Sequence, residues 1–190
     1  MKFHRVAALA AAIAVAGAVA QAGPLKLKLA KPQPDAVTQG LSVSYAYPDD
    51  VKSLRDAYIA IGVGGEEGVP LTGLDYVSSD EAPNALTSDK ETKVAAKITG
   101  YVKFDAEGVY KLEFFSNDGL ELSIGGQEVA RVDEKRGCDP IGEVEVRVPE
   151  AGWYALEALY WQRKGTSCLQ MMWAPEGGEL EVTPATAFGY

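Results

Sequence analysis

The chain has 190 residues, with 27 Asp and Glu against 18 Lys and Arg, a formal net charge of −9, and 47% apolar residues. The length is typical of one domain, and the apolar content is ordinary for a globular core and too high for a disordered chain. The negative charge disfavours nucleic acids and anionic membrane surfaces as partners, because polyanions repel one another.

The N-terminus has the pattern of a secretory signal peptide. A short basic start is followed by the apolar run 6–20 and by Ala20-Gln21-Ala22, whose small residues suit a signal peptidase. We therefore expect residues 1–22 to be removed during export by the general secretory route, to the periplasm or the extracellular space, with no membrane insertion afterwards. The alternative is a retained anchor, although the run is shorter than the roughly 20 residues of a membrane span.

The histidine and cysteine content of the mature chain excludes several kinds of catalytic and metal site. The single histidine, His4, would leave with the signal peptide. Without it, the chain cannot form a Ser–His–Asp triad, a Cys–His pair or a histidine-bearing zinc site. Cys138 and Cys168 are expected to form one disulfide in an oxidising compartment. The alternatives are a soft-metal site, which would need more ligands, and two free thiols.

The mature chain is expected to begin with a flexible, extended lead-in over residues 23–36. Its lysines alternate with Pro24, Pro32 and Pro34, and proline disfavours a helix. The domain itself is expected over residues 37–190, and its first strand is predicted where residues 41–45 alternate between apolar and polar side chains.

One helix is predicted after Pro48-Asp49-Asp50. An apolar stripe with spacings of three and four would face the core, an Asp would cap the first turn, and Gly62 would end the helix. The stripe consists of Val51, Leu54, Tyr58 and Ile61.

Beyond residue 90 the two-residue period of β-strands dominates. Turn-forming residues separate the alternating segments, and no helical pattern intervenes. The pattern predicts an all-β fold, an antiparallel β-sandwich or barrel with one short helix near the N-terminus of the domain. The alternating segments are 94–98, 110–114, 120–124, 144–148, 154–160 and 169–173.

The segment Ser116-Asn117-Asp118-Gly119-Leu120-Glu121-Leu122-Ser123-Ile124-Gly125 resembles the PA-fourteen domain family, named from the anthrax protective antigen. In that family a strand ends in an Asp-Gly-like turn and the next strand reads Leu-x-Ile-x-Gly. Segments 98–110, 151–160 and 169–173 are similar to further strands of the family in the same order. The resemblance covers about residues 37–190 and implies an antiparallel β-sandwich of a type commonly thought to bind carbohydrate.

The resemblance also implies a candidate calcium site. In fungal adhesins of this family, two adjacent aspartates hold a calcium ion that grips sugar hydroxyls, and the matching positions here are Asn117 and Asp118. The asparagine removes one of the two charges, and charge count tunes calcium affinity. The alternative is a purely structural turn, because Asn-Asp-Gly favours turns without any ligand.

Trp161 is the aromatic side chain expected at a binding rim, because it precedes the polar turn 162–165; burial in the core is the alternative. Acidic pairs such as Asp133-Glu134 do not by themselves indicate a glycosidase, since neighbours on a strand point to opposite faces. We therefore predict a secreted, non-catalytic module that binds an extracellular or cell-envelope glycan, with calcium as a candidate cofactor. The alternative is a protein-interaction or scaffold module without a metal site, whose partner is an envelope protein.

Overall fold

The computed structural model describes residues 23–190, and the predicted signal peptide lies outside the described residues. The elements are, in chain order, β1 (Leu25–Lys26), β2 (Ser42–Ala46), α1 (Leu54–Gly64), β3 (Glu66–Glu67), β4 (Asp75–Val77), β5 (Val94–Phe104), β6 (Gly108–Asn117), β7 (Gly119–Ile124), β8 (Gln127–Val132), β9 (Asp139–Val148), β10 (Gly152–Gln162), β11 (Cys168–Pro175), β12 (Glu181–Val182), the 3-10 helix η1 (Ala185–Ala187) and β13 (Phe188–Gly189).

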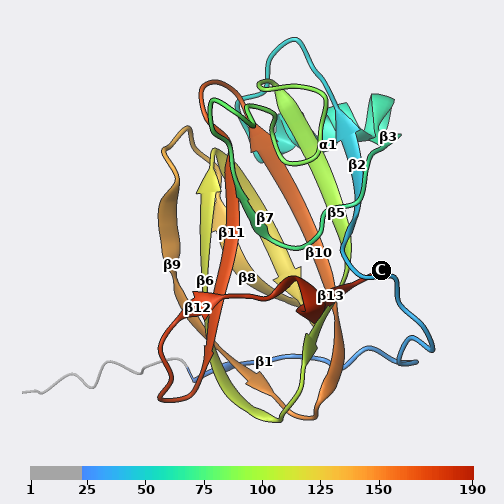
Figure 1. Ribbon diagram of the computed structural model, residues 1–190, viewed down its shortest axis with the longest axis vertical. Helices are drawn as coiled ribbons and strands as arrows, with labels where there is room; N and C mark the ends of the chain where they lie inside the picture. Colours follow the sequence, from blue (N-terminus) through green and yellow to red (C-terminus); the bar gives the residue numbers. More distant parts are fainter. Residues whose placement is uncertain (1–22) are drawn as a thin grey trace, which may run out of the picture.

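The strands form two sheets that pack as a β-sandwich, which confirms the predicted fold class (Figure 1). Sheet A has the order β1-β9-β6-β11-β12, with β4 also paired to β11. Sheet B has the order β3-β2-β5-β10-β7-β8, with β13 also paired to β5. Among the described strands, all pairings are antiparallel apart from that of β1 with β9.

The core lies between the sheets and uses one face of each long strand. On β10, Tyr154, Leu156 and Tyr160 are fully buried, while Ala155 and Glu157 between them face outward. Each large apolar side chain that is buried in this way contributes roughly 1.5–3 kcal/mol. The alternation that predicted the strands is therefore the alternation between core and outer face.

Helix α1 packs on the outer face of sheet B, beside β2 and β5 (Figure 1). Its Leu54 and Ala57 are buried in a second small core against Trp161. Tyr58 is 73% exposed, so its predicted place in the buried stripe is wrong. The buried face of the helix is centred on Leu54 and Ala57, and Tyr58, the next residue along the helix, points away from this face.

The ends of α1 also differ from the prediction. The N-cap is Ser53, whose Oγ accepts a hydrogen bond from the Asp56 amide at 3.1 Å, a position that serine suits as well as aspartate. At the other end the helix continues through Gly62, and the Gly65 amide closes it by donating to the Ile61 carbonyl. No helix within residues 23–190 is long and apolar enough to cross a membrane.

The lead-in, expected to be flexible, is instead held against the sandwich over much of its length. β1 pairs with β9, Leu27 is 1% exposed, and the Lys28 amide donates to the Gly125 carbonyl. Further on, the Gln33 side chain bonds the backbone of Trp153. Prolines exclude a helix here but leave the chain able to pair in an extended form.

Candidate functional site

The Asn117-Asp118 turn carries the chain from one sheet to the other. β6 ends at Asn117 in sheet A, and β7 begins at Gly119 in sheet B. The peptide bond between Asn117 and Asp118 is cis, and the two residues are only 6% and 1% exposed. The turn is therefore part of the interior at one end of the sandwich.

The Asp118 carboxylate joins two loops at this end. Its Oδ1 accepts a hydrogen bond from the Arg136 amide at 3.0 Å, and its Oδ2 accepts one from the Arg163 amide at 2.8 Å. Arg136 lies between β8 and β9, and Arg163 lies between β10 and β11. We call the turn together with residues 133–138 and 163–167 the loop end. Bonds from amides to a carboxylate are among the stronger ones in proteins, so Asp118 holds the loop end together.

Buried polar atoms without partners gather at the loop end. Within residues 23–190, six buried side-chain polar atoms have no hydrogen-bond partner, and five belong to residues at or beside the turn. Buried polar groups nearly always have a partner, so this group favours an additional water, ion or ligand. The five atoms are Ser116 Oγ, Asn117 Oδ1, Arg136 Nε, Gln162 Oε1 and Ser167 Oγ.

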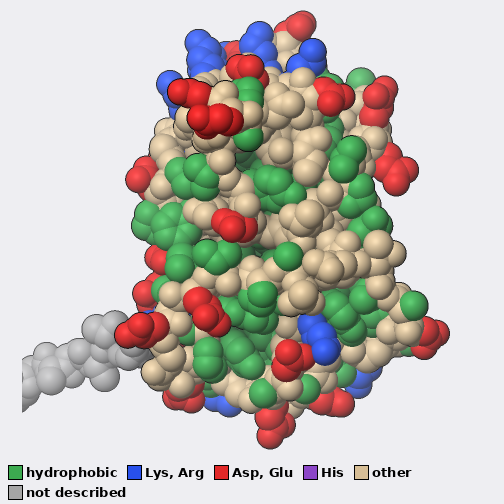
Figure 2. Space-filling model, in the orientation of Figure 1, with side chains coloured by type: hydrophobic (Ala, Val, Ile, Leu, Met, Phe, Trp, Pro, Cys, Tyr) green, Lys and Arg blue, Asp and Glu red, His purple; other side chains and the backbone are tan. Residues whose placement is uncertain are grey.

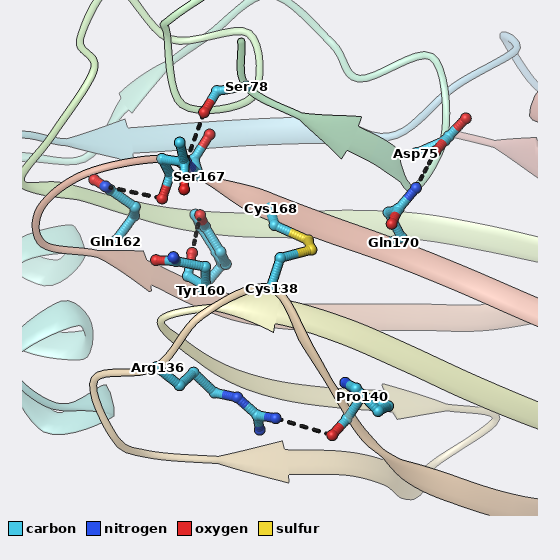
Figure 3. Close-up of a disulfide and its surroundings, with 12 residues drawn as sticks. Asp75, Ser78, Arg136, Cys138, Pro140, Tyr160, Gln162, Ser167, Cys168 and Gln170 are labelled. Atoms are coloured by element: carbon cyan, nitrogen blue, oxygen red, sulfur yellow. Dashed lines mark hydrogen bonds between the residues drawn. A yellow bond between two sulfur atoms is a disulfide. The ribbon is translucent and has the colours of Figure 1, made fainter.

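The predicted disulfide between Cys138 and Cys168 is present (Figure 3), and Cys168 pairs with Asn117 across β11 and β6. The Cα atoms are 5.5 Å apart, which is ordinary for a disulfide. β9 and β11 flank β6 on opposite sides, and they converge beyond Asn117, where β6 leaves the sheet. The bridge therefore fixes the two loops that Asp118 also joins.

A hollow of about 340 Å³ lies beside the loop end. It is lined by Tyr76, Glu81 and Ser167, among others, and Ser78 of its wall accepts a hydrogen bond from the Ser167 amide at 2.7 Å. An aromatic ring together with polar side chains is typical of a small-ligand site. Sequence reasoning missed this wall because residues 62–90 show no clear period, and their Gly, Pro, Asn and Asp content indicated only loops.

Trp161 does not lie on a binding rim, and that prediction is wrong. The side chain is fully buried under α1, and its Nε1 donates to Asp133 Oδ1 at 3.2 Å. The same oxygen accepts from the Leu54 amide at 2.6 Å, at the N-terminus of α1, where negative charge is favoured. Trp161 and Asp133 therefore anchor the helix, and the alternative reading of a core tryptophan holds.

Asp50 and Arg163 form an ion pair at the surface of the loop end. Arg163 Nε donates to Asp50 Oδ1 at 2.8 Å, and Lys52 lies 2.8 Å from Oδ2. Hydrogen bonds from Arg163 and Lys52 hold the pKa of Asp50 well below its usual range, and Asp50 raises the pKa of Arg163. Such exposed pairs contribute little stability, so their main effect is to orient Arg163.

The turn offers oxygen ligands, which calcium prefers, but only one negatively charged side chain. Asn117 Oδ1 and the Asp118 carboxylate would supply oxygen ligands, of which calcium takes six to eight. Within residues 23–190, no three Asp, Glu, Cys or His side chains gather as a metal site. Lys and Arg side chains lie at this end of the molecule, interspersed with Asp and Glu side chains (Figure 2). A cation here would therefore depend on one carboxylate and on neutral oxygens.

Residues 39–187 match the PA14 domain, and the chain belongs to this family. Several solved structures share the fold. The PA14 domain of the antifreeze protein MpAFP is 18% identical, with a TM-score of 0.65, over 82% of this chain and 93% of that one. A PA14 sugar-binding domain from an RTX adhesin is 20% identical, with a TM-score of 0.61, over 80% of this chain and 99% of that one.

A fungal adhesin is similar to the same extent. The A domain of Epithelial Adhesin 9 from Candida glabrata, solved with Galb1-4GlcNAc, is 18% identical, with a TM-score of 0.66, over 87% of this chain and 94% of that one. A comparison with curated protein sequences found no match.

Proposed function

We propose that the protein is an exported, non-catalytic module that binds extracellular carbohydrate at the loop end. The observation that carries the proposal is the group of five unpartnered, buried polar atoms around Asn117 and Asp118, beside the hollow lined by Tyr76. Because these atoms are buried, a bound ion or water would partner them from within, while sugar hydroxyls, which both donate and accept hydrogen bonds, would bond to the polar side chains that line the hollow.

The similar structures support a carbohydrate-binding role. The RTX adhesin domain is described as sugar-binding, and the Epithelial Adhesin 9 domain was solved with a disaccharide. An adhesin works outside the cell, and this agrees with the signal peptide predicted over residues 1–22.

Calcium is the proposed cofactor of this site. Asn117 Oδ1 and the Asp118 carboxylate would hold the ion, which when bound supplies further coordination sites for sugar hydroxyls. With a single carboxylate, the affinity is expected in the weak range of extracellular modules, with a dissociation constant of about 10⁻⁴–10⁻³ M. The protein's own contribution is to fix the Asp118 carboxylate through the Arg136 and Arg163 amides, with Cys138 and Cys168 joining the two loops that carry them.

A glycan array probed with the exported protein, once in calcium and once in chelator, tests the proposal. Binding that the chelator abolishes is expected, and an Asn117→Ala variant should lose it. Binding that survives the chelator and the variant would place the sugar away from the turn. A blank array would contradict carbohydrate binding and would favour the envelope-protein partner, to be sought by pull-down.

A further inference from the structure

A groove, separate from the hollow beside the loop end, lies on the outer face of sheet B, against α1. It consists of two neighbouring hollows, of about 460 Å³ and about 310 Å³, and Glu157 of β10 lines both. The larger hollow lies under α1, beside Tyr58, and the smaller one lies beside Tyr101 and Tyr190. The two together follow β10.

The floor of the groove is polar because α1 covers only part of the sheet. Two rows of side chains cross the strands β5, β10 and β7 where the helix leaves the face open. Side chains at directly opposed positions share a face of the sheet, so each row presents its groups together. The rows are Lys97, Leu159, Glu121 and Thr99, Glu157, Ser123.

Tyrosines stand at both ends of this floor. Tyr58 is 73% exposed on α1, and Tyr190 is 39% exposed at the other end. The helix packing described above gives Tyr58 no role in the core. An exposed ring beside hydrogen-bonding groups offers both an apolar face and polar contacts to a ligand.

The charges in the groove nearly balance. Glu121 pairs with Arg131, and within residues 23–190 neither Lys97 nor Glu157 has an ion-pair partner. One free cation and one free anion on the floor would each repel a ligand of the same sign, whereas hydroxyl groups can bond to both. The lining therefore suits an uncharged ligand rich in hydroxyls, although the whole chain has a net charge of −9.

We propose that this groove is a second carbohydrate site, which takes an extended neutral oligosaccharide along β10. From Ala155 to Leu159 the strand covers about 13 Å, which suits a chain of sugars better than a monosaccharide. The site uses neither Asn117 nor Asp118 and needs no calcium. It goes beyond the proposed function at the loop end and does not depend on it.

Amide chemical-shift mapping by NMR tests the proposal with five probes: cello-, xylo-, manno-, laminari- and maltohexaose, each titrated in the presence of chelator. At least one hexaose is expected to shift the amides of Glu157, Leu159 and Ser123, and to bind more tightly than its disaccharide. Tyr58→Ala is expected to weaken that binding roughly five- to tenfold through loss of stacking. Tyr47→Ala, which removes another exposed tyrosine that does not line the groove, should leave it unchanged.

Two results would overturn the proposal: no shift along β10 with any hexaose, or equal affinities for the wild type and Tyr58→Ala. Shifts confined to Arg136, Arg163 and their neighbours would place the sugar at the loop end alone, and would also reject the groove. Because the two sites report through different amides, failure of one is distinguishable from failure of the other.

Discussion

Asp118 was expected to hold a ligand, and in the structure it also holds the protein together. Its two oxygens accept the amides of Arg136 and Arg163, and it is 1% exposed. Asp118→Ala should lower the free energy of unfolding by about 2–4 kcal/mol, because both amides lose their acceptor inside the protein. Denaturant titration measures this loss. Asp118→Asn, which keeps one acceptor, should lose less, and Asp49→Ala at an exposed position should lose almost nothing.

Asn117 sets the charge of the turn. Asn117→Asp should be less stable than the wild type in chelator, because two carboxylates would then be buried side by side. Calcium should relieve this repulsion and raise the melting temperature of the variant more than that of the wild type. Thermal unfolding in calcium and in chelator measures both effects. Gln39→Glu, at an exposed glutamine away from the loop end, is the control, and equal calcium shifts in all three proteins would exclude an ion at Asn117.

Position 119 requires glycine because there is no space for a side chain. A Cβ at this position would collide with the indole ring of Trp161. Gly119→Ala should therefore lower the free energy of unfolding by about 1–3 kcal/mol through overpacking. Gly62→Ala is the matched control, because nothing lies near its Cβ position and it sits within α1, where alanine should stabilise by about 0.5–1 kcal/mol. Thermal unfolding should show a lower melting temperature for Gly119→Ala and a higher one for Gly62→Ala. An unchanged melting temperature for Gly119→Ala would contradict the close contact with Trp161.

At the scale of the elements, the long strands follow directly from local pattern. β5, β6, β7, β10 and β11 each contain a segment predicted from alternation, and β9 contains another. β8 was missed, because the adjacent apolar Val129 and Ala130, both buried, interrupt its two-residue period where the pairing of β7 with β8 shifts register. Alternation signals a strand only while the register is regular.

The disulfide connects elements that alternation alone would leave apart. It closes a loop of 30 residues between the starts of β9 and β11, and the chain-entropy estimate for such a loop is about 3–4 kcal/mol. Replacing both Cys138 and Cys168 by serine should lower the free energy of unfolding by about that amount in denaturant titration. Reductant should destabilise the wild type similarly and leave the double variant unaffected. A wild type insensitive to reductant would show that the bridge does not contribute.

For the whole molecule, buried phenols limit stability at high pH. Burial in the core raises the pKa of Tyr45 from 10.0 to about 12, and burial raises that of Tyr160 as well. The unfolded chain therefore ionises first, and the Tyr45 contribution is complete below about pH 10 and is lost as the pH rises to about 12. Between these two pH values, one such tyrosine lowers the free energy of unfolding by about 1.4 kcal/mol per pH unit. Denaturant titrations at several pH values across this range give the free energy of unfolding as a function of pH. Its fall with pH should be less steep for Tyr45→Phe than for the wild type, and an equal fall would show that Tyr45 does not contribute.

The sequence alone was sufficient for the all-β class, most of the long strands, the cysteine pair and the family, because each rests on a local period, a count or an ordered set of motifs. Alternation states which side chains share a face, but not which face meets the other sheet or what covers the outer one. The exposure of Tyr58 and the burial of Trp161 both depend on where α1 docks, and only the tertiary structure decides that. The burial of Asn117 and Asp118 also depends on the tertiary structure. The same residue types form a turn between two sheets and a turn within one hairpin, so the sequence does not distinguish the two.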